Sequence, residues 1–209
     1  MFKRTFSRWV IGVCGLTLAA TAVLARPTAV FTEVIPEGPP TALVGGSVVD
    51  VETGTVIRNA TIIVDRGRIT AIGPAPSIQI PEGAQLVPME GQWLIPGLMN
   101  MHVHLGLKLP GAAGTALANE TDVELVLRMA DNARRSLLAG VTTVRLTNEK
   151  NGTDFALKAA INRGTQLGPR IFSAGMSIVP TGGHGAIGAD GPYAVARAVR
   201  QQIENGAEW

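Results

Sequence analysis

The sequence predicts an α/β protein in which a small antiparallel sheet precedes the first three units of an incomplete (β/α)₈ TIM-type barrel. Segments rich in Val, Ile and Thr, separated by turn signals, fill residues 41–92. From residue 93 onward, strand-like segments alternate with amphipathic helical segments, which is typical of parallel βαβ units. The first of these strands ends in a His-x-His pair, and active sites of such barrels lie at the carboxyl ends of the strands.

Residues 1–25 have the pattern of an export signal. The basic start consists of Lys3, Arg4 and Arg8. The apolar run at 10–25 is shorter than the about 20 residues that a membrane span needs, so we expect cleavage after Ala25, or alternatively after Ala22. Retention as an N-terminal anchor is the remaining alternative. We therefore expect an exported protein, periplasmic or extracellular, that meets the membrane only through this segment.

The net charge and the cysteine content both change when this segment is set aside. The whole chain has a net charge of +2. Without the three basic residues of the signal, 15 Lys and Arg face 16 Asp and Glu, a net charge of −1. This balance gives no reason to expect nucleic acid as a partner. Cys14 lies inside the signal, so the mature chain has no cysteine for a disulfide or a metal site.

Residues 26–40 contain prolines without a period and are predicted to form an extended linker. An antiparallel sheet is expected next, within 41–92. Its strands are predicted at 43–51, 56–64, 68–72 and 85–89, with turns at 52–54 and 65–67. About fifty residues make too small a core to be stable alone.

Residues 93–209 are predicted to form the three barrel units. In the first, Thr121 and Glu124 form a capping box that starts a helix running to about residue 139. Its apolar face is expected to contain Val123, Val126, Leu127, Ala130, Ala133 and Leu137. The second unit is a strand at 141–146 and a helix that Thr153 or Asp154 caps and Gly164 ends. The third is a strand at 170–178 and a helix at 190–205, with Val195, Val199 and Ile203 on one face; residues 207–209 resemble the start of a fourth strand.

The stretch Trp93–Leu105 contains the candidate metal ligands. On a strand, alternate side chains share a face, so Asn100, His102 and His104 are expected to point the same way. Two adjacent imidazoles can hold one divalent ion, at roughly 2.0–2.1 Å from each nitrogen for zinc. The alternative is that these are ordinary polar residues at the end of a buried strand.

At these residues, PGLMNMHVHL (96–105) resembles the first barrel strand of the metal-dependent amidohydrolase superfamily. There the pattern Pro-Gly-x-x-(Asp/Asn)-x-His-x-His supplies two ligands of a catalytic metal centre. The segments 140–145, 168–170 and 181–185 are similar to the exported Xaa-Pro dipeptidase and imidazolonepropionase-like group. The resemblance covers about residues 41–209, the N-terminal part of a typical member. It implies that residues 41–92 form part of a β-sandwich, and that a carboxylated Lys, two further His and a catalytic Asp follow residue 209.

The resemblance also implies a function. A complete member would hydrolyse a non-aromatic C–N bond, in an amide or peptide, with water activated by one or two Zn²⁺ or by another divalent metal. Asn100 would support the ligands through hydrogen bonds. The substrate would be a small or dipeptide-like molecule, and homo-oligomerisation is left open. Because two imidazoles fill half of a tetrahedral site, this chain alone is expected to be inactive. The alternatives are a non-catalytic exported binding or assembly module, or the same fold acting on a phosphotriester or a cyclic amide.

His184 is the third candidate site residue, in the glycine-rich loop at 180–185. Glycines allow backbone N–H groups to approach a ligand, and His184 could polarise a carbonyl or contact a substrate carboxylate. The alternative is a solvated His in a flexible loop. Arg145 could be an inward-facing strand residue, but a structural salt bridge is the expected role, and Leu146 occupies a position that is often acidic in the resembled family.

Overall fold

The computed structural model describes residues 37–208. The predicted signal segment, Cys14 and most of the predicted linker lie outside the described residues. Within 37–208, no helix combines the length and the apolar character that crossing a bilayer requires.

The first sheet contains five strands. These are β1 (Thr41–Val49), β2 (Val56–Asp65), β3 (Arg68–Pro74), β4 (Gln85–Pro88) and β5 (Trp93–Leu94). Their order is β3-β2-β1-β4, and β5 also pairs with β1. The β1–β2 and β2–β3 pairs are antiparallel, which confirms the hairpins predicted from the turn residues.

β4 and β5 do not continue the antiparallel pattern, and in this respect the prediction was wrong. Both strands pair with β1 in the parallel direction. The reason is that the chain after β3 passes through the short helix η1 (Ala75–Ser77) and joins the free edge of β1 instead of pairing with β3. Because Trp93 pairs with Ser47, the first sheet extends two residues past the predicted boundary at residue 92. Its small core is formed by Val48, Ala60 and Ile62.

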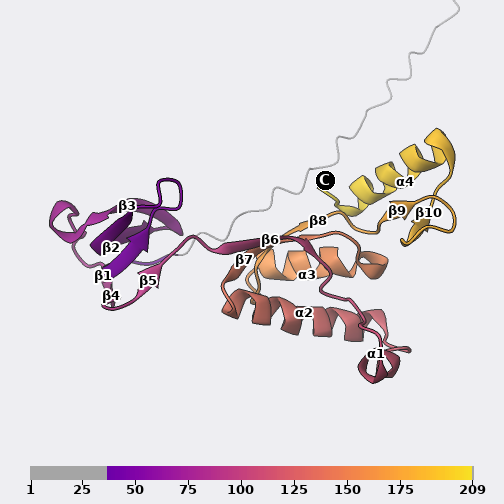
Figure 1. The fold of residues 1–209 in the computed structure, drawn as a ribbon, viewed down its shortest axis with the longest axis horizontal. Coiled ribbons are helices and arrows are strands. Elements are labelled where there is room, and N and C mark those ends of the chain that lie inside the picture. Colours follow the sequence, from indigo (N-terminus) through magenta and orange to yellow (C-terminus); the bar gives the residue numbers. More distant parts are fainter. Residues whose placement is uncertain (1–36, 209) are drawn as a thin grey trace, which may run out of the picture. The chain divides into compact units, whose positions relative to one another are not determined.

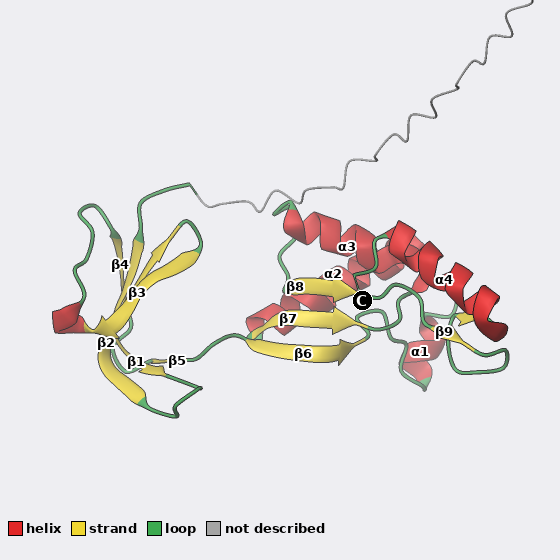
Figure 2. Cartoon of the chain, turned by 90° about the horizontal axis from the view of Figure 1, so that it is seen from above, coloured by secondary structure: helices red, strands yellow, loops and turns green. Residues whose placement is uncertain are grey.

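The second sheet is parallel and contains β6 (Leu98–Val103), β7 (Val141–Leu146) and β8 (Arg170–Ser173), in that order. Figure 2 shows the three strands running in the same direction. Two helices, α2 (Asp122–Leu138) and α3 (Thr153–Asn162), cover one face of this sheet (Figure 1). Parallel strands that alternate with helices confirm the predicted βαβ arrangement.

The core between this sheet and its helices fixes the orientation of α2. It consists of Leu105, Leu125, Met129, Ala133, Val144, Leu146, Leu157 and Ile171. The buried stripe of α2 is therefore Leu125, Met129 and Ala133, at i, i+4 and i+8. The predicted face was wrong at Val123 and Leu127, whose exposed fractions are 71% and 66%.

The caps of the two helices differ from each other. At α2 the predicted capping box is present, since the Thr121 hydroxyl accepts from the Glu124 N–H and the Glu124 carboxylate accepts from the Thr121 N–H. At α3 the prediction was wrong, because Gly152 is the N-cap and has a left-handed backbone conformation. The Thr153 hydroxyl instead donates to the Lys150 carbonyl at 2.7 Å.

The third unit is more divided than predicted. β8 ends at Ser173 because Gly175 follows with φ of +70°. The short strands β9 (Ile178–Val179) and β10 (Ile187–Gly188) come next, and α4 (Gly191–Asn205) follows. After α4, the Glu208 N–H donates to the Ser173 carbonyl at 3.0 Å, as expected if a strand next to β8 begins there. The short helix α1 (Ala112–Ala116) lies in the loop between β6 and α2.

Candidate metal centre

His102 and His104 lie at the carboxyl end of β6, and their rings are neighbours. His102 is in the strand and His104 follows its last residue. The ring centroids are 5.2 Å apart and the ring planes meet at 77°. The Asn100 side-chain oxygen accepts from the His102 N–H at 3.2 Å, so Asn100 is tied to the backbone of one candidate ligand. The structure therefore brings together three of the four predicted site residues.

The environment of His104 favours one tautomer. Its Nδ1 lies 3.3 Å from the Asn148 carbonyl oxygen, which can only accept a hydrogen bond. A proton on Nδ1 leaves the lone pair of Nε2 available, and ligating imidazoles typically donate their other N–H to a carbonyl or carboxylate in this way. The Thr147 hydroxyl faces the same ring, 3.4 Å from Nε2 and 3.5 Å from Nδ1. The chemistry of this residue fits a metal ligand.

The donor set is incomplete within the part of the chain that the structure describes. No group of three or more His, Cys, Asp or Glu side chains that could hold a metal ion is found among residues 37–208. Two imidazoles provide half of a tetrahedral zinc site, so further ligands would have to come from elsewhere. The two His residues fit a divalent cation as part of a site.

His184 lies in a different environment. It is exposed, in the loop between β9 and β10. The loop is closed at its base because Asp190 accepts from both the N–H and the hydroxyl of Thr181. Across residues 37–208, none of the observed hydrogen bonds or ring contacts joins His184 to His102 or His104. A substrate-binding role for His184 remains a prediction.

Arg145 and Leu146, at the end of β7, have contrasting environments. The Arg145 Nε donates to the Met101 carbonyl of β6 at 2.6 Å, so this side chain bridges the two strands. Leu146 is fully buried and belongs to the core of the parallel sheet. An acidic side chain at this position of this chain would be buried among apolar groups.

Glu149 is a buried acid that the sequence analysis missed. Its exposed fraction is 4%, and both carboxylate oxygens accept from the Gly106 N–H, at 3.1 and 3.2 Å. Burial raises the pKa of Glu149 to about 7, against the opposing effect of its backbone hydrogen bonds. In sequence it is one acid in a polar loop, and only its position just after a parallel strand could have drawn attention to it.

Asp154 is a second buried acid, on α3. Ser173, at the end of β8, donates a hydrogen bond from its hydroxyl to this carboxylate, and the other oxygen, Oδ1, has no hydrogen-bond partner among residues 37–208. Burial raises the pKa of Asp154. Lys158, one turn later on the same helix, forms an ion pair with Glu208. These contacts join α3 to β8 and to the segment after α4.

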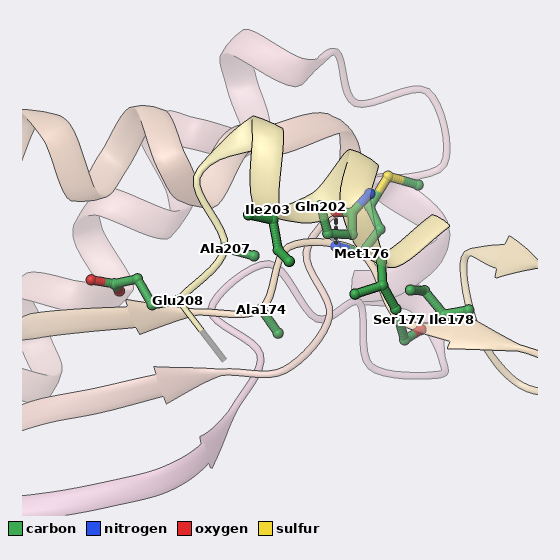
Figure 3. Close-up of a pocket in the computed structure, with 9 residues that line it drawn as sticks. Ala174, Met176, Ser177, Ile178, Gln202, Ile203, Ala207 and Glu208 are labelled. Atoms are coloured by element: carbon green, nitrogen blue, oxygen red, sulfur yellow. Dashed lines mark hydrogen bonds between the residues drawn. The ribbon is translucent and has the colours of Figure 1, made fainter. Parts of the chain in front are cut away.

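A pocket of about 460 Å³ lies between the loop after β8 and helix α4 (Figure 3). Its lining residues include Met176, Ile178, Val199 and Ile203. Gln202 lies at its wall, where the side-chain oxygen accepts from the Met176 N–H at 2.9 Å. The pocket is mainly apolar and lies beyond the carboxyl end of β8.

A parallel sheet with helices on one face and paired imidazoles at the carboxyl end of a strand defines a class of α/β proteins whose sites lie at that end. The model of the amidohydrolase family matches residues 93–209, more than half of the chain. The chain belongs to the amidohydrolase family.

Individual relatives agree with this assignment. A crystal structure of a prolidase complexed with N-methylphosphonate-L-proline is 29% identical with a TM-score of 0.71, over 80% of this chain and 45% of that one. A Xaa-Pro dipeptidase structure with bound methionine gives the same identity, TM-score and coverage. Ochratoxinase of Aspergillus niger is 26% identical in an alignment 195 residues long, which covers 74% of this chain and 38% of the relative. The chain therefore spans less than half the length of these proteins.

Proposed function

We propose that the protein is a metal-dependent hydrolase that cleaves a non-aromatic C–N bond in a small amide or dipeptide-like substrate. The observation that supports this proposal most directly is the pair of neighbouring imidazoles at the end of β6, with Nδ1 of His104 facing the Asn148 carbonyl. This arrangement leaves a lone pair on His104 for a cation, in a chain that belongs to the amidohydrolase family.

His102 and His104 would hold one divalent cation together, zinc being the expected metal and a second ion being compatible with the proposal. A bound divalent cation polarises a carbonyl group and lowers the pKa of water. Asn100 would hold the His102 backbone in place through the 3.2 Å hydrogen bond to its N–H. In this proposal the remaining ligands and the acid–base group come from outside residues 37–208, so the 209-residue chain alone is inactive.

The relatives support the proposed substrate class. Two are a prolidase and a Xaa-Pro dipeptidase, and their structures contain a phosphonate derivative of proline and methionine. The third relative is ochratoxinase. We therefore favour peptides and amides over phosphotriesters and cyclic amides as candidate substrates. In this proposal, residues 41–92 belong to a β-sandwich, the signal segment exports the protein, and His184 contacts the substrate.

Metal titration of the full-length gene product, including any residues that follow 209, tests the proposal. Apo protein would be titrated with Co²⁺, whose visible absorption reports its ligands, and then with Zn²⁺. We expect His102→Ala and His104→Ala each to weaken binding at least about tenfold. His184→Ala is the matched control, because it removes an exposed imidazole from another loop; its metal affinity should stay unchanged.

Hydrolysis of an Xaa-Pro dipeptide and an N-acyl amino acid would be measured on the same metal-loaded samples. Metal binding that survives both single His substitutions would overturn the proposed site. Metal binding that depends on both residues, together with no hydrolysis of any amide, peptide, phosphotriester or cyclic amide, would favour the non-catalytic binding module instead.

A further inference from the structure

We propose that Glu149 is a positioning residue of the metal site: its buried carboxylate fixes the turn after β6 and thereby the direction in which the His104 ring points. This inference rests on the proposed function, because it concerns the same two imidazoles. It adds a residue from a different strand end, which neither the His-x-His pattern nor the relatives identify.

The contact between Glu149 and the turn is close. The turn consists of residues 104–107, and its Gly106 N–H donates to both Glu149 oxygens. A Cβ on Gly106 would come within 2.6 Å of Glu149 Oε2 and 2.9 Å of Leu125 Cδ1. Real Cβ atoms do not approach other atoms so closely. The carboxylate therefore fills the space next to Gly106, and a larger residue there would displace the Glu149 carboxylate or the Leu125 side chain.

The carbonyl groups of the same turn are held from helix α2. The Asn132 side chain donates to the Leu105 carbonyl at 2.9 Å. The Arg128 guanidinium donates to the Gly106 carbonyl at 3.0 Å and to the Leu107 carbonyl at 3.3 Å. Since Glu120 pairs with the same guanidinium, with a 2.6 Å contact at Nε, Arg128 is itself fixed in direction. Glu149 supplies the acceptor for the Gly106 N–H, so both the carbonyl groups and an N–H group of the turn have side-chain partners.

The segment that contains Glu149 also contacts the His104 ring. The carbonyl of the preceding residue, Asn148, lies 3.3 Å from His104 Nδ1. The Glu149 N–H donates to the Gly175 carbonyl at 3.3 Å, and the Asn148 side-chain oxygen accepts from the Ser177 N–H at 3.0 Å. The loop after β7 is thus anchored to the loop after β8, and it holds both the His104 ring and the turn beside it.

A side chain in this position acts on metal affinity through geometry. Hydrogen-bond partners behind the ligands of a metal orient them, and their loss typically weakens binding about 10- to 100-fold. Removal of the Glu149 carboxylate would leave the part-buried Gly106 N–H without this acceptor. Gln at this position keeps one acceptor oxygen for that N–H, so Glu149→Gln should restore much of what Glu149→Ala loses.

The test is Co²⁺ and Zn²⁺ titration of the full-length gene product carrying Glu149→Ala or Glu149→Gln. The matched control is Asp154→Asn, which alters another buried carboxylate of the same sheet-and-helix unit, one that bonds to Ser173 and not to the turn. We expect about 10- to 100-fold weaker binding and an altered Co²⁺ spectrum in Glu149→Ala. We also expect partial recovery in Glu149→Gln and wild-type affinity in Asp154→Asn.

Hydrogen exchange of the Gly106 and His104 amides is the second measurement, made without metal. Faster exchange in Glu149→Ala, with exchange in the first sheet unchanged, supports the inference. Wild-type affinity and spectrum in Glu149→Ala overturn it while the proposed function stands, and an equal loss in Asp154→Asn also overturns it. If the wild type binds no metal through His102 and His104, the proposed function fails first and this inference fails with it.

Discussion

The Glu149 carboxylate accepts twice from one backbone N–H, that of Gly106, at 3.1 and 3.2 Å. This pair of hydrogen bonds joins the loop after β7 to the turn after β6, and Glu149 as a residue is only 4% exposed. Because burial raises the pKa of this carboxyl from its ordinary 4.5 to about 7, its charge changes within the physiological pH range. This buried acid therefore links the pH of the solution to the stability of the fold.

The free energy of unfolding should fall as the pH rises from about 4.5 to about 7. The folded state binds the Glu149 proton more tightly than the unfolded chain does. The stabilisation from this proton is therefore fully present below the pKa that Glu149 has in the unfolded chain, and it is lost as the pH rises through the pKa that Glu149 has in the folded state. The difference between the two pKa values corresponds to on the order of 3 kcal/mol. Urea unfolding of the full-length protein at several pH values measures it.

Glu149→Gln is the comparison for this pH dependence. This variant has no ionisable group at position 149, so the part of the pH dependence of the unfolding free energy that is due to Glu149 should be absent. The substitution should therefore be least destabilising above pH 7. Asp131→Asn is the control, since Asp131 pairs with Arg134 and Arg135 on the exposed side of α2. Parallel pH profiles for the wild type and Glu149→Gln would contradict the prediction.

Thr121→Ala should destabilise the sheet-and-helix unit by about 1 kcal/mol, because the first turn of α2 loses the hydroxyl that accepts from the Glu124 N–H at 3.3 Å. Thr121→Ser keeps that acceptor and should retain most of the stability. Urea midpoints of the two variants, compared at one pH, measure the difference. Equal midpoints would show that the capping box does not contribute.

Local signals made much of the parallel sheet predictable. The capping box at Thr121 and the β-branched run at 141–146 are patterns formed by residues close together in sequence. The helix and the strand that they predict both appear in the structure. The buried face of α2 was not predictable in this way, because Val123 and Leu127 are as apolar as Leu125 and Met129. Hydropathy therefore gives two overlapping faces, and only packing against β7 selects one.

Long-range contacts explain the remaining differences. The direction of β4 depends on which edge of β1 is free, which no local pattern encodes. The proximity of His102 and His104 follows from the two-residue period of a strand and could be predicted. The burial of Glu149 could not, because it depends on Gly106, 43 residues away in sequence.

Gly97→Ala should be destabilising by about 1–3 kcal/mol, because a Cβ at this position would collide with the Thr142 side chain on β7. This contact explains why glycine precedes β6. Gly188→Ala is the matched control, since the nearest atom to a Cβ there is the Thr181 hydroxyl at 3.7 Å. Unfolding midpoints in urea measure both, and a loss in Gly188→Ala equal to that in Gly97→Ala would contradict the steric explanation.

Residues 26–209 expressed alone should be largely insoluble or molten. Ile203 on α4 is 60% exposed and Leu127 on α2 66%, so apolar side chains of both helices lack cover within the described residues. The outer edge of β6 has no strand beside it within residues 37–208, and such edges promote aggregation. Binding of a hydrophobic dye, weak near-ultraviolet circular dichroism and a broad thermal transition are the expected observations, with the full-length gene product as the control. A sharp cooperative melt from a soluble monomer of residues 26–209 would contradict the prediction, since it would show that the exposed faces need no partner.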